Sequence, residues 1–161
     1  MDNLNIVLTK DPANFSFCAE MMAATDPWIT LDMDFRQCLE AFEGEGKEVY
    51  LMLSNGDIAG FVILQIYGTF SGYIQTICIG KDFRGAGLGN KLLCFCEERI
   101  HKFSPNVFIC VSSFNTGATR LYYKFGFKLV GELPDFVKNG FTELLLRKTI
   151  GPRAGYNAKN E

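Results

Sequence analysis

The stretch that decides the fold is ICIGKDFRGAGLGNKLL, residues 77–93. It begins as an apolar strand, passes through a glycine-rich turn and continues as a helix. Gly85, Gly87 and Gly89 remove side chains at alternate positions, so the backbone N–H groups can close around an anion. The helix predicted over residues 88–102 directs its unpaired amides and the positive end of its dipole at the same point. The stretch therefore predicts a binding site for a pyrophosphate.

The spacing of these glycines distinguishes between classes of nucleotide. A dinucleotide fingerprint needs G-x-G-x-x-G, but Asn90 stands three positions after Gly87. The next strand ends in the residues CVS at 110–112, with no acidic side chain to bind a ribose hydroxyl. A Walker-type loop needs Gly-Lys-Ser/Thr, whereas Gly80-Lys81 precedes the turn and Asp82 follows it. Neither of these two classes fits the stretch.

Two motifs resemble those of the GCN5-related N-acetyltransferase (GNAT) family. The first, Arg84-x-x-Gly87-x-Gly89, is similar to the family's acetyl-CoA loop, R/Q-x-x-G-x-G/A. The second, NTGATRLYYKFGF at residues 115–127, is similar to the signature N-x-x-A-x-x-L-Y-x-x-x-G-F. The resemblance covers roughly residues 44–149, and the chain looks most similar to ribosomal-protein and protein N-terminal amine acetyltransferases. It implies the acyl-CoA N-acyltransferase fold, an α/β (α+β) fold with a mixed, mostly antiparallel seven-stranded sheet and helices on both faces. A V-shaped split is expected between the strands over 73–79 and 106–111.

The order of predicted elements agrees with this fold. Three consecutive antiparallel strands precede the phosphate-binding helix, unlike the alternating order of a doubly wound fold. Asn55-Gly56 predicts a type I′ hairpin turn between the first two of them. The strand over 106–111 is almost wholly apolar, which is typical of a strand buried on both faces. Strands are expected over residues 4–9, 48–53, 58–67, 73–79, 106–111, 127–133 and 141–148. Helices are expected over residues 12–24, 33–42, 88–102 and 115–124.

Composition indicates an ordinary globular protein. A chain of 161 residues suits one domain, expected over 1–149 with a mobile tail over 150–161. Apolar residues make up 48% and the net charge is −2, which gives no general reason to bind nucleic acid or a membrane. The six cysteines lie within predicted helices and strands at spacings that fit no zinc site. We expect buried reduced thiols, no metal, a cytoplasmic location and a monomer or homodimer.

The resemblance also implies how acetyl-CoA would be held as a cosubstrate. The backbone amides of Arg84, Gly85, Ala86, Gly87, Leu88 and Gly89 would bind its pyrophosphate. The strand edge at Ile77, Cys78 and Ile79 would hydrogen-bond the pantetheine arm, and an N–H there would polarise the thioester carbonyl. Asn115 has two possible roles, as the N-cap of the short helix or as a hydrogen-bond partner of the pantetheine, and both can hold.

Tyr122 is the catalytic residue that the resemblance implies, as the general acid that protonates the departing CoA thiolate. The competing interpretation is that Tyr122 only packs against the pantetheine arm, with Tyr123 equally available. His101, the single histidine, is expected to be a charge partner at the end of the main helix.

The chain departs from the family at the general base. Many members carry a glutamate at the position of Gln75, and a glutamine amide cannot accept a proton near pH 7. The rate is therefore expected to climb with pH toward the pKa of the substrate amine. Other carboxylates could act as the base through water, namely Glu143, Glu132, Asp135, Asp32 and Asp34. For Glu143 the favoured interpretation is a solvated position on a strand face.

Three functions remain open from the sequence. The leading one is an acetyl-CoA-dependent N-acetyltransferase, in which a primary amine of a peptide N-terminus, a lysine or a small molecule attacks the thioester directly. The second is a non-catalytic CoA-binding module, which the missing glutamate permits. The third is an acyltransferase for a small-molecule amine or for a longer acyl chain.

Overall fold

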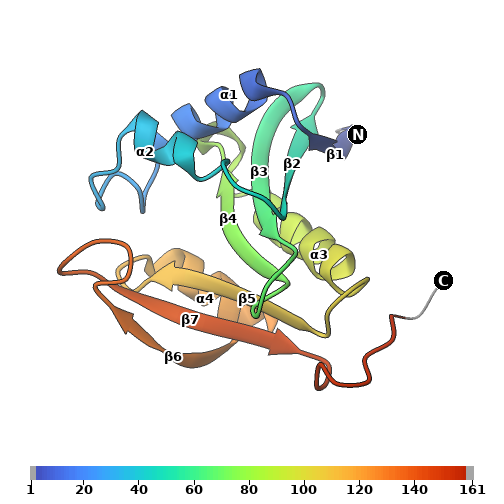
Figure 1. Ribbon diagram of the computed structural model, residues 1–161. Coiled ribbons are helices and arrows are strands. Elements are labelled where there is room, and N and C mark those ends of the chain that lie inside the picture. Colours follow the sequence, from blue (N-terminus) through green and yellow to red (C-terminus); the bar gives the residue numbers. More distant parts are fainter. Residues whose placement is uncertain (1–2, 159–161) are drawn as a thin grey trace.

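A seven-stranded sheet in the order β1-β2-β3-β4-β5-β7-β6 forms the centre of the molecule (Figure 1). The computed structural model describes residues 3–158, so two residues of the predicted domain and three of the predicted tail lie outside the described residues. Neighbouring strands are antiparallel except β4 and β5, which run parallel. This confirms the predicted mixed sheet. The strands are β1 (Leu4–Thr9), β2 (Lys47–Ser54), β3 (Asp57–Gln65), β4 (Tyr73–Ile79), β5 (Asn106–Ser112), β6 (Lys128–Pro134) and β7 (Thr142–Thr149).

Helices cover both faces of the sheet (Figure 1). On one face α1 (Pro12–Ala23) and α2 (Phe35–Glu40) form an apolar cluster with β2, β3 and β4. On the other face α3 (Leu88–Ile100) and α4 (Thr116–Phe125) pack in a second cluster that extends to β5 and β7. A single 3-10 turn, η1 (Lys81–Phe83), connects β4 to the glycine-rich loop.

Capping side chains set the starts of three of these helices. Asp11 accepts from the amide of Ala13 at 2.9 Å and starts α1. Asp34 and Gln37 form a reciprocal capping box, which starts α2 two residues later than the predicted Met33. Asn115 accepts from the amide of Ala118 and starts α4. Helix α3 differs, because its N-cap is Gly87 and no side chain caps it.

The sheet splits between β4 and β5. These strands pair only at Tyr73 with Phe108 and at Ile74 with Ile109. Beyond Ile74, β4 stays paired with β3, while β5 stays paired with β7 as far as Ser112 opposite Glu143. The two halves of the sheet therefore diverge at the carboxyl ends of β4 and β5, as predicted.

Strand β5 is buried on one face only, so the prediction of burial on both faces is wrong. Val107, Ile109 and Val111 are buried in the cluster with α3 and α4. The alternate residues Asn106, Phe108 and Cys110 are half-buried on the other face, and Ser112 at the end of the strand is buried there. The reason is that α1 and α2 pack over β2, β3 and β4 and leave this face of β5 open.

The cysteines are all free thiols, and none of them forms a disulfide. Cys94 is exposed and Cys96 is buried, as expected for two residues on different faces of a helix. The expectation of buried thiols is wrong for Cys94, and Cys110 is only half-buried. His101 lies at the end of α3, with its Nε2 3.6 Å from the Oε1 of Glu97. It thus lies beside a carboxylate at a helix end, where the sequence places it.

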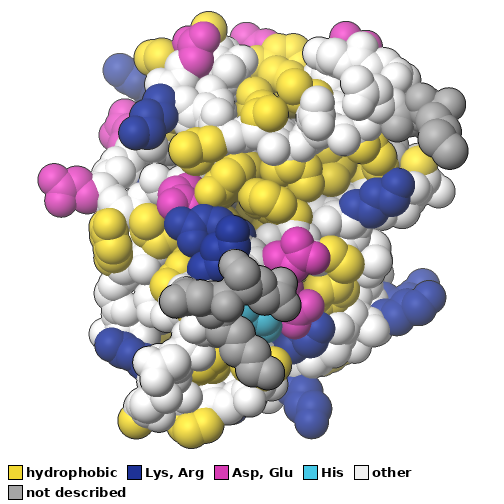
Figure 2. All heavy atoms as spheres, turned by 90° about the vertical axis from the view of Figure 1, so that its right-hand side faces the viewer, with side chains coloured by type: hydrophobic (Ala, Val, Ile, Leu, Met, Phe, Trp, Pro, Cys, Tyr) yellow, Lys and Arg dark blue, Asp and Glu magenta, His cyan; other side chains and the backbone are white. Residues whose placement is uncertain are grey.

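Charged side chains of both signs lie next to each other on the face shown in Figure 2, around the single histidine. None of the helices among residues 3–158 is long and apolar enough to cross a membrane. After β7 the described chain runs back past α3, where the Tyr156 hydroxyl donates to the carbonyl oxygen of His101. The division into a domain and a mobile tail stays a prediction.

Candidate active site

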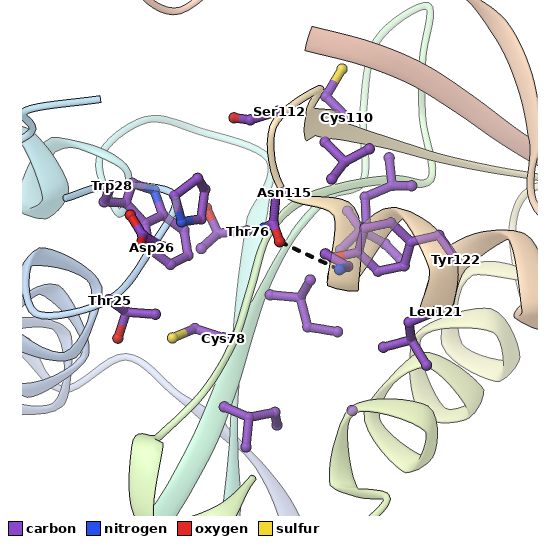
Figure 3. Close-up of a pocket in the computed structure, with 18 of the residues that line it drawn as sticks. Thr25, Asp26, Trp28, Thr76, Cys78, Cys110, Ser112, Asn115, Leu121 and Tyr122 are labelled. Carbon is purple, nitrogen blue, oxygen red and sulfur yellow. Dashed lines mark hydrogen bonds between the residues drawn. The ribbon is translucent and has the colours of Figure 1, made fainter. Parts of the chain in front are cut away.

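A cavity of about 760 Å³ occupies the split between β4 and β5. It extends from the glycine-rich loop to the far face of the sheet, where segments 25–33 and 136–137 contribute to its wall. Its volume lies within the usual range for small-molecule sites. Figure 3 shows Thr25, Asp26 and Trp28 on one side, Asn115, Leu121 and Tyr122 on the other, and Cys78 of β4 between them.

The glycine-rich loop has room and donors for an anion. Gly85 and Gly87 have φ values of 80° and 74°, which side chains rarely adopt. A β-carbon at either position would meet nothing within 4 Å. Because α3 starts at Gly87 without a capping side chain, its first amides have no side-chain acceptor. The residues present therefore fit a pyrophosphate.

The other residues of the predicted loop support this arrangement. The Nε of Arg84 donates to the carbonyl oxygen of Ile79 at 3.1 Å, which joins the loop to the end of β4. Leu88 is buried and fixes the loop to the core. A β-carbon at Gly89 would lie 3.3 Å from the Cδ2 of Leu121, so α3 and α4 approach closely there. Ala86 is exposed and is the one residue of the predicted loop outside the cavity wall.

The predicted strand edge lies along the cavity. Ile77, Cys78 and Ile79 all contribute to its wall. They pair with β3 on one side and have no partner in β5 on the other. An extended edge of this kind can hydrogen-bond an amide-rich chain as another strand would.

Asn115 and Tyr122 both reach the cavity from α4. The side chain of Asn115 serves as the N-cap, which confirms one of its two predicted roles. Tyr122 is 7% exposed, and its ring meets Phe127 edge-on at 6.0 Å. Burial raises the pKa of the Tyr122 hydroxyl, with smaller contributions from the thiols of Cys96 and Cys78.

The Tyr122 hydroxyl opens into the cavity. Among residues 3–158 it has no hydrogen-bond partner, and in that part of the chain every fully buried side-chain nitrogen or oxygen has one. An unpartnered hydroxyl at the cavity wall is available to a bound molecule. Tyr123, the alternative, is 44% exposed and lies outside this wall.

Gln75, at the family's glutamate position, has a structural role here. Its Nε2 donates at 2.8 Å to the carbonyl oxygen of Ala41, at the end of α2. The Nζ of Lys47 donates to the same oxygen at 2.9 Å. Gln75 thereby joins β4 to α2, and a carboxylate in its place would face a carbonyl oxygen.

Glu143 is buried at the cavity wall, so the expected solvated strand face is wrong. Its side chain is 5% exposed, and its Oε1 accepts from the Oγ of Ser112 at 2.5 Å. Burial raises the pKa of the Glu143 carboxyl, and the hydrogen bond from Ser112 opposes that shift.

The other four candidate carboxylates lie outside the cavity wall. Asp34 caps α2, and the Oδ1 of Asp135 accepts from the amide of Gly140 at 2.6 Å. Glu132 is exposed on β6, and the side chain of Asp32 is 92% exposed.

Sequence reasoning missed the contacts that surround the far end of the cavity. Lys138, in the loop between β6 and β7, donates to the carbonyl oxygen of Leu31 at 2.8 Å and so joins that loop to the α1–α2 connection. Asp26 also lines the cavity, with its Oδ1 accepting from the amide and hydroxyl of Thr30. The apolar side chains of Trp28, Phe136 and Val137 lie at the same end.

Comparison with known proteins identifies the family. The model of the acetyltransferase (GNAT) domain matches residues 28–150. The chain belongs to the GNAT acetyltransferase family. Members of this family use acetyl-CoA as their cosubstrate and act on amines. Within the described residues, no group of three or more His, Cys, Asp or Glu side chains is placed to hold a metal ion.

Individual GNAT proteins resemble the chain to different extents. The probable spermine N(1)-acetyltransferase of Bacillus subtilis subsp. natto (strain BEST195) is 30% identical over 90 residues. That match covers 48% of this chain and only 57% of the relative. The ribosomal-protein-S18-alanine N-acetyltransferase of Escherichia coli has a TM-score of 0.70 at 19% identity, over 94% of this chain and 96% of its own. The Salmonella typhimurium protein yncA, solved with its cofactor acetyl-CoA, has a TM-score of 0.67 at 18% identity, over 96% of this chain and 98% of its own. These two likenesses show the fold.

Proposed function

We propose that this GNAT protein transfers an acetyl group from acetyl-CoA to a primary amine that enters at the Trp28 and Phe136 end of the cavity. The observation that carries the proposal is the open split in the sheet, because one cavity reaches both the uncapped start of α3 and the opposite face of the sheet. A thioester laid in the split would be open to attack from the side opposite to α4.

Different segments of the chain would bind different parts of acetyl-CoA. The amides from Arg84 to Gly89 would hold the pyrophosphate at the start of α3. The edge of β4 at residues 77–79 would bind the pantetheine arm, and an N–H there would polarise the thioester carbonyl. Asn115 would contact the same arm while it caps α4.

Tyr122 is the proposed general acid. The amine nitrogen forms a bond to the carbonyl carbon, the carbon–sulfur bond breaks, and the electron pair stays on sulfur. The Tyr122 hydroxyl gives its proton to that sulfur. Its partner-free position at the cavity wall supports this role over simple packing.

The acceptor is proposed as an amine with an apolar neighbour group. Trp28, Phe136 and Val137 supply the apolar surface, and Asp26 and Glu143 supply carboxyl groups for an ammonium. Both a peptide N-terminus and a small amine meet this description. Spermine and an alanine N-terminus enter as candidates because similar proteins carry those substrates in their names.

Thiol release tests the proposal. Acetyl-CoA is incubated with the protein and, in turn, spermine, a peptide that starts with alanine, a lysine-containing peptide with a blocked N-terminus, and phenethylamine. We expect amine-dependent thiol release with at least one of them, and a mass increase of one acetyl group on that amine. Tight CoA binding without amine-dependent release would instead indicate a non-catalytic module. Faster release from a longer acyl-CoA would indicate a different acyl donor.

A further inference from the structure

The general base of this protein has to come from somewhere other than the usual strand position. Gln75 cannot accept a proton, and its amide is occupied by the carbonyl oxygen of Ala41. An amine that arrives as an ammonium must lose a proton before it can attack a thioester. The cavity wall contains two carboxyl groups within the described residues, those of Asp26 and Glu143.

These two carboxyl groups differ in their surroundings. The Oδ1 of Asp26 accepts two hydrogen bonds from Thr30 in its own loop. Glu143 lies on a strand in the middle of the C-terminal half-sheet, directly opposite Ser112. Its burial and the 2.5 Å hydrogen bond from Ser112 fix the carboxylate at the cavity wall. Glu143 is thus the better placed of the two.

Glu143 and Tyr122 approach the split from opposite faces of the sheet. Leu144 and Leu146 of β7 pack in the cluster with α3 and α4, so the alternate residue Glu143 points to the other face. Tyr122 belongs to the α4 side. Figure 3 shows Cys110, a neighbour of Glu143 on that other face, and Tyr122 on opposite sides of β5. Both Glu143 and Tyr122 reach one cavity because the sheet is open there.

We propose that Glu143 is the general base of this enzyme, positioned by Ser112. The proposal rests on the acetyltransferase function proposed above. Direct attack needs a proton acceptor on the side of the entering amine and a proton donor on the side of the leaving sulfur. Glu143 and Tyr122 supply these two groups from the two faces of the sheet.

The proton balance closes. The ammonium gives one proton to the Glu143 carboxylate, which later releases it to solvent. The neutral nitrogen forms the bond to carbon, the carbon–sulfur bond breaks, and the sulfur takes the Tyr122 proton. As the amide forms, the nitrogen loses a second proton, which restores Tyr122 through water. The sum is an acetamide, CoA thiol and one proton released.

Burial favours the neutral form of the Glu143 carboxyl, and the groups that face it add no charge. Tyr73 of β4 and Cys110 of β5 lie near it, and burial raises the pKa of each, so both are neutral near pH 7. Ser112 contributes the one hydrogen bond that favours the carboxylate. A bound ammonium would add an opposite charge and lower the pKa of Glu143 again.

The test is the pH profile of kcat/KM for Glu143→Gln, with acetyl-CoA and whichever amine of the panel reacts. Gln keeps the size of the side chain and can still accept from Ser112. In the wild type, kcat/KM should level off above the pKa of Glu143, which replaces the climb toward the pKa of the amine that Gln75 alone predicts. In the variant it should rise about tenfold per pH unit up to the pKa of the amine. For an amine with a pKa near 10.4, kcat/KM of the variant at pH 7 is expected to be lower than that of the wild type by about 10²-fold or more. For an α-amine with a pKa near 7.8 it is expected to be about tenfold.

Two further variants separate proton transfer from a structural role. Glu132→Gln makes the same change at an exposed position of the neighbouring strand and should leave the profile unchanged. Ser112→Ala removes the hydrogen bond that favours the Glu143 carboxylate. The rise of kcat/KM on the acidic side of its pH profile should therefore move to higher pH, while the plateau above it remains. Because this variant retains Glu143, it also tests the proposal if Glu143→Gln does not fold.

A wild-type pH profile in Glu143→Gln, or a loss confined to the KM of the amine, would overturn the proposal. The same holds for an unmoved acidic limb in Ser112→Ala. These results presuppose amine-dependent turnover by the wild type. Absence of that turnover contradicts the proposed function itself, so the two failures are distinguishable.

Discussion

Replacement of Tyr122 by phenylalanine isolates the proposed proton donor. The ring is 7% exposed and meets Phe127 edge-on at 6.0 Å, and phenylalanine keeps this packing. The hydroxyl has no partner among residues 3–158, so its removal leaves no other group unpaired. We therefore expect the free energy of unfolding to change by less than about 1 kcal/mol.

The size of the kinetic effect follows from the surroundings of the hydroxyl. Burial raises the pKa of Tyr122, whereas an ordinary thiol has a pKa of about 8.5. Proton transfer to the thiolate is therefore uphill until the amide nitrogen loses its second proton, so the rate effect of the hydroxyl comes from the hydrogen bond that it donates to the charge developing on sulfur. A hydrogen bond to a charged group contributes about 1.5–3 kcal/mol, which corresponds to about a 10- to 150-fold change in rate. General acids contribute about 10²–10⁴-fold. We expect kcat to fall by a factor of about 10².

Steady-state thiol release over a range of acetyl-CoA concentrations measures this effect. Tyr122→Phe should lower kcat with little change in the KM for acetyl-CoA. Tyr123→Phe is the matched control, because this neighbour is exposed and lies outside the cavity wall. Unchanged kcat in Tyr122→Phe would refute the reasoning, and a loss in KM alone would assign the hydroxyl to binding.

Two further changes test the loop and the strand. Gly87→Val places a branched side chain in the space above the start of α3 and should abolish CoA binding measured by calorimetry. The left-handed backbone adds a strain of about 1–2 kcal/mol, and Gly56→Val carries the same strain in a remote hairpin, where CoA affinity should be unchanged. Gln75→Glu removes the donor to Ala41 and places a carboxylate near a carbonyl oxygen. Chemical denaturation should show that the free energy of unfolding falls by about 1–3 kcal/mol, and the rate of acetyl transfer should not increase. A faster variant would show instead that a carboxylate at position 75 is all that the protein lacks as a base.

Local sequence signals sufficed where the structure depends on neighbouring residues. Asn55 and Gly56 both have positive φ, as a type I′ turn requires. The glycines of the central loop and the Asn115 cap were predictable for the same reason, since each acts on the backbone next to it. The second face of β5 was mispredicted because composition alone does not tell which strands a helix covers.

Contacts between distant segments were out of reach of the sequence. Glu143 of β7 is buried opposite Ser112 of β5, a residue that lies 31 positions earlier in the chain. The bond from Gln75 to Ala41 spans 34 residues, and that from Lys138 to Leu31 spans 107. An acidic residue in a strand is usually solvated, so the burial of Glu143 carries no local signal. The position of this carboxylate at the cavity wall is therefore found only from the fold.

A crystal structure with bound CoA tests the central claim most directly. The account predicts pyrophosphate oxygens on the amides between Arg84 and Gly89, the pantetheine arm along the free edge of β4, and the sulfur within about 3.5 Å of the Tyr122 hydroxyl. The carboxylate of Glu143 should face the sulfur end from the opposite side of the sheet. CoA bound outside the split, or a sulfur directed away from Tyr122, would contradict it.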